Sequence, residues 1–197
     1  MKHSKCYLFA VTLLVLAIAP TLASAQGYVV ANLYSTGTDD TRAVLNPGVS
    51  DLHYTLVSAP ASFWGSFQGG LAYTTALGAS GWWSPGNDLF GWINPFNNGA
   101  TGGPASAPAG QYVYRTTFYL DPDCVDPATM QLFGRFAADD NACIWVNGTN
   151  TNQCTKSGWI SPTNFKIKGP YFHTGVNTVD FVVNNSGGPT GLLANIY

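Results

Sequence analysis

The sequence predicts an all-β protein, an antiparallel two-sheet β-sandwich. Three observations support this fold class. Apolar residues recur at alternate positions in several short segments, as half-buried strands require. Gly, Pro, Asn and Asp, which favour turns, fill the intervals between those segments. Beyond residue 25 no stretch has apolar residues at helical spacing, and the chain contains no Glu, a residue that favours helices.

The first segment, residues 1–25, matches a secretory signal peptide. Lys2 and Lys5 precede an apolar run, and Ala23-Ser24-Ala25 supplies a small-residue cleavage pattern. The apolar run is shorter than the roughly 20 residues that a membrane span needs. We therefore expect an exported chain that begins at Gln26 and is released as a secreted protein without a membrane anchor.

Residues 26–197 are expected to form a single domain, because this length suits one sizeable core. The alternating pattern predicts strands, in chain order, at 28–34, 52–58, 71–77, 112–120, 130–138, 143–147, 164–168, 178–184 and 191–197. The clearest strand places on one face Tyr112, Tyr114, Thr116, Phe118 and Leu120. A Gly/Ala/Pro-rich stretch at 97–110 predicts a long loop between the third and fourth strands.

Two stretches resemble a known family. The first comprises 114–118, 136–141 (Phe-Ala-Ala-Asp-Asp-Asn) and 144–148 (Ile-Trp-Val-Asn-Gly), and the second comprises 175–185 and 188–192. They are similar to a galactose-binding-like jelly-roll domain of exported bacterial proteins, of the type that often carries a PEP-CTERM sorting tail. No such tail is recognised in this sequence. The resemblance implies a jelly roll and export, and it does not indicate a binding site.

Charge and motif content exclude several function classes. Beyond residue 25, six Lys and Arg residues stand against ten Asp residues, a net charge of −4, so there is no basic stripe for nucleic acid. No Gly-x-Ser-x-Gly motif occurs, and His53 and His173 lack a paired Ser/Asp motif. We therefore predict that the protein is not an enzyme, and hydrolysis is the function that the sequence favours least.

Three tryptophans in one loop-like stretch, Trp82, Trp83 and Trp92, form the predicted carbohydrate-binding site with Asn87 and Asp88. Indole rings stack on the apolar face of sugars, while amides and carboxylates bind hydroxyls. The competing interpretation is that these side chains are core pieces under a long loop, and Trp92 fits that interpretation best. Because Trp82 and Trp83 are adjacent, at least one should be partly exposed.

Aspartates in two turns are weak candidates for a structural Ca²⁺, and no other cofactor is expected. They are Asp121, Asp123 and Asp126 in one loop and Asp139 and Asp140 in another. Calcium takes six to eight oxygen ligands, of which one such loop supplies only a part. Asp in these contexts is also ordinary turn chemistry.

The cysteines predict one disulfide bond, between Cys143 and Cys154, with Cys124 as a free thiol. Two turns are possible between the bonded cysteines. A two-residue loop at Gly148-Thr149 places Cys143 opposite Cys154. A type I′ turn at Asn147-Gly148, which that dipeptide favours, places Cys143 opposite residue 152 and makes the bond harder to form.

These observations predict a secreted, non-catalytic binding module for a polysaccharide or cell-surface glycan. The alternative is a structural subunit of an extracellular matrix or envelope layer. A binding module should gather exposed aromatic side chains around a concave site, whereas an assembling subunit should spread apolar surface over a flat patch. The sequence does not separate these two functions, nor does it predict the oligomeric state.

Overall fold

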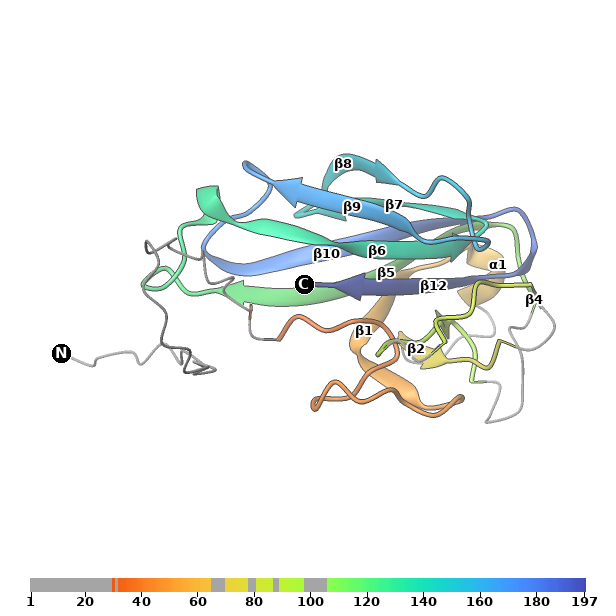
Figure 1. The fold of residues 1–197 in the computed structure, drawn as a ribbon. Helices are drawn as coiled ribbons and strands as arrows, with labels where there is room; N and C mark the ends of the chain where they lie inside the picture. The colour runs from red at the N-terminus through yellow and green to blue at the C-terminus, as the bar shows by residue number, and fades with distance from the viewer. Residues whose placement is uncertain (1–29, 31, 65–69, 78–80, 87–88, 98–105) are drawn as a thin grey trace, which may run out of the picture.

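The computed structural model describes residues 30, 32–64, 70–77, 81–86, 89–97 and 106–197 (Figure 1). The predicted signal peptide and the Asn87-Asp88 pair lie outside the described residues. The described part of the predicted strand at 28–34 is not in a strand. Within the described residues, no helix has the length and apolarity that crossing a membrane requires.

Strands account for nearly all of the regular structure. In chain order the elements are β1 Ser50–Ser58, α1 Ala61–Trp64, β2 Leu71–Thr74, β3 Ile93–Asn94, β4 Ser106–Ala107, β5 Gly110–Leu120, a 3₁₀ turn Pro127–Thr129, β6 Gln131–Asp139, β7 Asn141–Val146, β8 Thr149–Cys154, β9 Thr163–Lys168, β10 Gly175–Asn185, β11 Gly188–Pro189 and β12 Gly191–Ile196.

One long antiparallel sheet has the order β8-β7-β10-β5-β1-β2-β3-β12-β6-β9, and β11 pairs with β4 in a small second sheet. The long sheet folds over, so that β6 and β12 face β10 (Figure 1). Phe136 of β6 and Phe181 of β10 meet across the interior with their ring centroids 5.7 Å apart. The antiparallel all-β sandwich is therefore confirmed, with two layers that are continuous with each other.

The main core lies between the layers and follows from the alternation of side chains. Tyr112, Tyr114 and Phe118 of β5 point inward and are buried, as are Val179 and Phe181 of β10. β5 and β10 pair along their whole length, which aligns their apolar faces. Removing these large side chains from water is the main favourable contribution to folding.

A second apolar cluster covers the outer side of β6 and β12. Ala137 and Leu193 point away from the main core and pack against Trp82, Phe90 and Trp92. Phe136, Ala137 and Ala138 are therefore all buried, because both faces of this end of β6 are covered. We call these five residues with their partly buried neighbours, which are Leu77, Trp83 and Trp159, the aromatic cluster.

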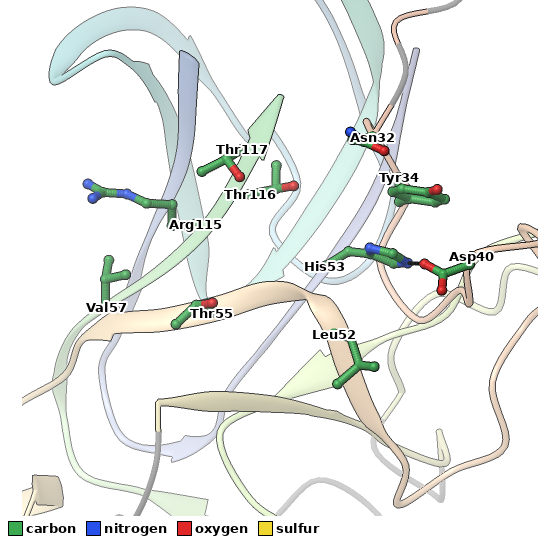
Figure 2. Close-up of a pocket in the computed structure, with 10 residues that line it drawn as sticks. All are labelled: Asn32, Tyr34, Asp40, Leu52, His53, Thr55, Val57, Arg115, Thr116 and Thr117. Carbon is green, nitrogen blue, oxygen red and sulfur yellow. Dashed lines mark ion pairs between the residues drawn. The ribbon is translucent and has the colours of Figure 1, made fainter. Parts of the chain in front are cut away.

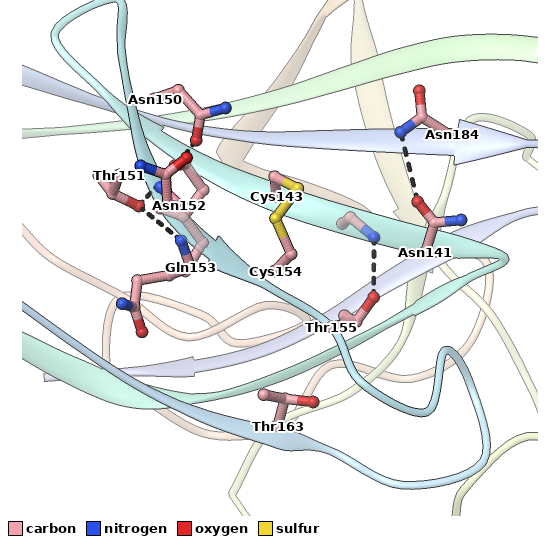
Figure 3. The surroundings of a disulfide bond; sticks show 12 residues. Asn141, Cys143, Asn150, Thr151, Asn152, Gln153, Cys154, Thr155, Thr163 and Asn184 are labelled. Carbon is pink, nitrogen blue, oxygen red and sulfur yellow. Dashed lines mark hydrogen bonds between the residues drawn. A yellow bond between two sulfur atoms is a disulfide. The ribbon is translucent and has the colours of Figure 1, made fainter.

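The hairpin of β7 and β8 contains the predicted disulfide bond (Figure 3). Asn147 and Gly148 have positive φ angles of 49° and 76° between the paired residues Val146 and Thr149, as a type I′ turn requires. The register then shifts between Ile144 and Trp145. The shift brings Cys143 opposite Cys154, and the two are bonded.

A bulge in β8 thus reconciles the type I′ turn with the disulfide bond. Ile144 pairs with Gln153 and Trp145 with Asn150, so Thr151 and Asn152 are the extra residues. Thr151 Oγ1 donates a hydrogen bond to the carbonyl oxygen of Ile144 at 2.7 Å. Asn152 has a φ of 58°, the left-handed conformation that Asn tolerates better than most residues.

The prediction that Cys124 is a free thiol is wrong. Cys124 is disulfide-bonded in the structure. Its partner lies outside the described residues.

Candidate ligand-binding site

Two hollows adjoin on the outer face of the layer formed by β1, β5, β10 and β7. Their volumes are about 380 and 390 Å³, and Val57 and Arg115 line both of them. Figure 2 shows the first hollow, with Arg115 toward one side and Tyr34 and His53 toward the other. We call the two hollows together the sheet groove.

One row of paired residues forms the middle of the sheet groove. Thr55 of β1 is opposite Arg115 of β5, Arg115 is opposite Asp180 of β10, and Asp180 is opposite Trp145 of β7. Residues directly opposite one another in antiparallel strands project from the same face of the sheet. Strand register therefore brings a hydroxyl, a cation, a carboxylate and an indole ring into one line.

Arg115 and Asp180 form a bidentate ion pair. Arg115 Nε donates to Asp180 Oδ1 at 2.6 Å and Nη2 donates to Oδ2 at 2.7 Å. The Asp180 side chain is 9% exposed and that of Arg115 is 39% exposed. The hydrogen bond to Asp180 raises the pKa of Arg115. This fork geometry fixes the guanidinium plane and leaves Nη1 unused in the pair.

Trp145 supplies the aromatic part of the sheet groove. It is half-buried and lines the second hollow with Val113 and Val182. Among the described residues, no group accepts a hydrogen bond from its indole N–H. A ring with one open face and a free donor, beside an apolar floor, suits a ligand with both apolar and hydroxyl surface.

The other end of the sheet groove is a stack of rings and charges. The rings of Tyr34 and His53 are parallel within 9°, with centroids 3.6 Å apart. The guanidinium carbon of Arg42 lies 4.9 Å from the centre of the Tyr34 ring. His53 Nε2 is 3.4 Å from Asp40 Oδ1 (Figure 2). These contacts hold Tyr34 and His53 as a rigid wall of the first hollow.

Asp51 anchors this wall from beneath. It is fully buried, and Asp51 Oδ1 accepts a hydrogen bond from the backbone N–H of His53 at 2.9 Å. Asp51 Oδ2 accepts another from the backbone N–H of Gly37 at 2.7 Å. Burial raises the pKa of Asp51, and these two hydrogen bonds act in the opposite direction. The carboxyl group therefore ties the loop before β1 to the strand that carries His53.

The predicted tryptophan site is mostly core. Trp82 and Trp92 are buried with ring centroids 4.3 Å apart. Trp82 Nε1 donates to Asp139 Oδ2 at 2.7 Å, and Trp92 Nε1 donates to the carbonyl oxygen of Trp83 at 2.9 Å. Both rings cover β6 and β12 and are buried, and sugar binding by these two residues stays a prediction.

Trp83 differs from its two neighbours because it is partly exposed. Its ring stacks on Phe90 with centroids 6.4 Å apart, and the guanidinium carbon of Arg135 lies 5.3 Å from its centre. The expectation that one member of the Trp82-Trp83 pair is partly exposed is thus confirmed. Sugar binding by Trp83 stays a prediction, and Asn87 and Asp88 lie outside the described residues.

Asp139 is the most perturbed carboxyl group near the aromatic cluster. Burial raises its pKa to about 6, and the neighbouring charge of Asp140 acts in the same direction. The hydrogen bond from the Trp82 indole opposes the shift. Asp139 is therefore part of the packing around Trp82, with no opening toward the sheet groove among its described contacts.

The weak calcium candidates do not converge. Asp121 Oδ1 accepts a hydrogen bond from the backbone N–H of Asp123 at 2.9 Å, and Asp126 Oδ1 accepts one from that of Ala128 at 2.9 Å. Asp140 Oδ2 accepts one from the backbone N–H of Ser186 at 2.5 Å. In the part of the chain that the structure describes, no three His, Cys, Asp or Glu side chains are grouped to hold a metal ion. The aspartates stabilise turns instead.

Neither a protein-family model nor a curated protein matches the sequence. Among solved structures, the chain is similar to an apo lectin of Pleurotus ostreatus, with 29% identity over 47% of this chain and a TM-score of 0.37; it spans only 25% of that chain. A second is the CBM36-1 domain of a multidomain xylanase from the hindgut metagenome of Trinervitermes trinervoides, with 17% identity and a TM-score of 0.32. That match covers 55% of this chain and 81% of the xylanase domain. A third is a family 35 carbohydrate-binding module from Clostridium thermocellum, with 13% identity and a TM-score of 0.33. That match covers 83% of this chain and 95% of the module. At these TM-scores the fold assignment rests on the strand pairing.

Proposed function

We propose that the protein is a secreted, non-catalytic module that binds a polysaccharide or other glycan in the sheet groove. The observation that carries the proposal is the partly exposed Trp145 ring beside the Arg115–Asp180 pair. A sugar ring has an apolar C–H face that stacks on an indole and hydroxyl edges that exchange hydrogen bonds with fixed polar groups. Val113 and Val182 complete the apolar floor under such a ring.

The carboxylates of the sheet groove support binding rather than glycoside hydrolysis. Glycosidases use two carboxyl groups, one of which is protonated and serves as a general acid. Arg115 occupies both carboxylate oxygens of Asp180 in a bidentate pair. Asp40, the other carboxylate at the groove, is 87% exposed on a loop. In the part of the chain that the structure describes, no second carboxyl group lines the hollow that contains Asp180.

Export is the second part of the proposal, and it rests on the signal-peptide pattern of residues 1–25. The Cys143–Cys154 bond supports it, because disulfide bonds persist in oxidising compartments outside the cytosol. In this proposal the N-terminal segment is cleaved after Ala25 and the remaining protein is released. N-terminal sequencing of the secreted product should begin at Gln26.

The test of binding is a glycan array with wild-type protein, followed by titration of the strongest ligand against a Trp145→Ala variant. We expect the variant to bind at least about tenfold more weakly, because aromatic anchors dominate binding energy. Tyr119→Ala is the matched control, since Tyr119 is an exposed aromatic residue of β5 that lines neither hollow. Wild-type protein that binds no glycan, or a Trp145→Ala variant that binds as well as wild type, would refute the proposal.

A further inference from the structure

The opposite layer of the sandwich exposes a second, unlike surface on the outer side of β9, β6 and β12. Phe133 of β6 pairs with Lys166 of β9, and Gln131 pairs with Lys168. These four side chains are exposed, whereas Leu132, between Gln131 and Phe133, points into the core. The alternation that builds the core on one side of β6 and β9 therefore builds this surface on the other.

Two aromatic rings stand at the centre of this surface. Phe133 is 43% exposed and Tyr197 is 58% exposed. Their ring centroids are 4.5 Å apart with an angle of 84° between the planes. The backbone fixes the pair, because each residue's N–H donates to the carbonyl oxygen of the other at 2.9 Å. An exposed pair of large rings held this firmly is a preformed apolar contact surface.

Cations flank the rings. Lys166, Lys168 and Arg135 project from the same side of β6 and β9, and they are three of the six cations beyond residue 25. Among the described residues, neither lysine forms an ion pair. The exposed outward positions of β6 and β9 carry no carboxylate. Positive charge is therefore concentrated on one face of a chain whose overall charge is negative.

Arg135 connects this surface to the aromatic cluster. Its guanidinium carbon lies 5.3 Å from the centre of the Trp83 ring and 5.1 Å from that of Phe90. Phe133 is two positions along the same strand, about 7 Å away on the same side. We call the surface formed by Trp83, Arg135, Phe133, Tyr197, Lys166 and Lys168 the basic–aromatic face.

We infer that the basic–aromatic face binds an anionic polysaccharide, a polymer with repeating carboxylate or sulfate groups. Lys166 and Lys168 are about 7 Å apart along β9, a spacing at which successive acidic units of an extended chain are reachable by flexible lysines. The Phe133 and Tyr197 rings offer stacking surface for the sugar rings between those charges. Nucleic acid is disfavoured, because three cations on a net-negative protein displace few counterions.

The test is a titration of wild-type protein with polygalacturonate and with heparin, using neutral dextran and a DNA duplex as comparison polymers. We expect binding to polygalacturonate or heparin that weakens as salt rises, because the contacts are exposed charges. The Lys166→Gln/Lys168→Gln double variant should bind at least about tenfold more weakly. The Lys166→Arg/Lys168→Arg variant should retain binding, since it keeps both charges.

Two controls separate this face from the sheet groove and from a general charge effect. Lys156→Gln removes an exposed cation that precedes β9 and should leave polygalacturonate or heparin binding unchanged. Trp145→Ala should also leave it unchanged, whatever that variant does to groove binding. The inference is overturned if wild-type protein binds neither acidic polymer, if the double Gln variant binds as tightly as wild type, or if DNA binds as tightly as the acidic polysaccharides.

Discussion

Two regions of this protein that contain tryptophan differ in how far their indole rings are buried. Trp82 and Trp92 come from a segment with little regular structure, and they are buried against β6 and β12. Trp145 comes from a regular strand, and it is partly exposed at the sheet groove. Burial of these side chains therefore depends more on whether their side of the sheet is covered than on whether they lie in a strand or a loop.

Glycine 191 shows how closely the covering segment packs. A Cβ atom at Gly191 of β12 would lie 2.6 Å from Cη2 of Trp82 and 2.9 Å from the carbonyl oxygen of Ile93. Only a residue without a side chain lets the indole ring approach the strand this far. The groove side has no equivalent covering segment among the described residues, so Trp145 keeps an open face.

The largest expected effect is on the free energy of unfolding, when a buried ring of the aromatic cluster is removed. Trp82→Ala should lower the free energy of unfolding by about 3–5 kcal/mol, because it opens a cavity and leaves Asp139 without its indole donor. Trp145→Ala should lower it by about 1 kcal/mol or less, as for a surface side chain. Urea denaturation of both variants measures the two effects. Similar losses of unfolding free energy in the two variants would show that the two tryptophans do not differ in burial as described.

The next effect concerns the hairpin beside the sheet groove. Breaking the Cys143–Cys154 bond with a Cys143→Ser/Cys154→Ser double variant should cost about 2–4 kcal/mol. The loss should be local to the groove side: glycan binding at Trp145 should weaken, while the near-ultraviolet circular dichroism of the buried Trp82–Trp92 pair persists. Loss of that signal under native conditions would show that the two regions are coupled.

The smallest expected effect is the pH dependence of the covered region. Burial raises the pKa of Asp139 to about 6 from an unfolded value of 3.8, so the folded protein binds a proton more tightly than the unfolded chain. Asp139 therefore stabilises the fold most below about pH 4, and this contribution is lost as pH rises to about 6. Asp51 has a raised pKa and contributes with the same sign.

Unfolding free energies measured between pH 4 and 7 test this contribution. Asp139→Asn removes the titrating group and keeps an oxygen that can accept from the Trp82 indole. The variant should therefore show a shallower fall in stability with rising pH than wild type. Asp123→Asn, on an exposed turn, is the control and should retain the wild-type slope. An unchanged slope in Asp139→Asn would show that this carboxyl group does not control the pH dependence.

Local patterns in the sequence predict most of the longer strands and which of their side chains face the core, but they miss β8 and place a strand at 28–34 whose described residues are not in one. The alternation at 112–120 predicts β5 and its buried Tyr112, Tyr114 and Phe118, because a strand turns successive side chains to opposite faces. The same local rule identifies Arg115 and Asp180 as outward residues of two strands. It also favours the type I′ turn at Asn147-Gly148, which forms as that dipeptide requires.

Which strands are neighbours, and which faces of the sheet are covered, depend on contacts between segments that are distant in the chain. The Arg115–Asp180 pair exists because β5 lies beside β10, 65 residues further along the chain. The Cys143–Cys154 bond coexists with the type I′ turn because a bulge at Thr151 and Asn152 shifts the register. Trp82 is buried because its segment folds onto the outside of β6 and β12. Side-chain alternation is a property of neighbouring residues, whereas pairing and covering bring together segments that are distant in the chain, so no local pattern specifies them.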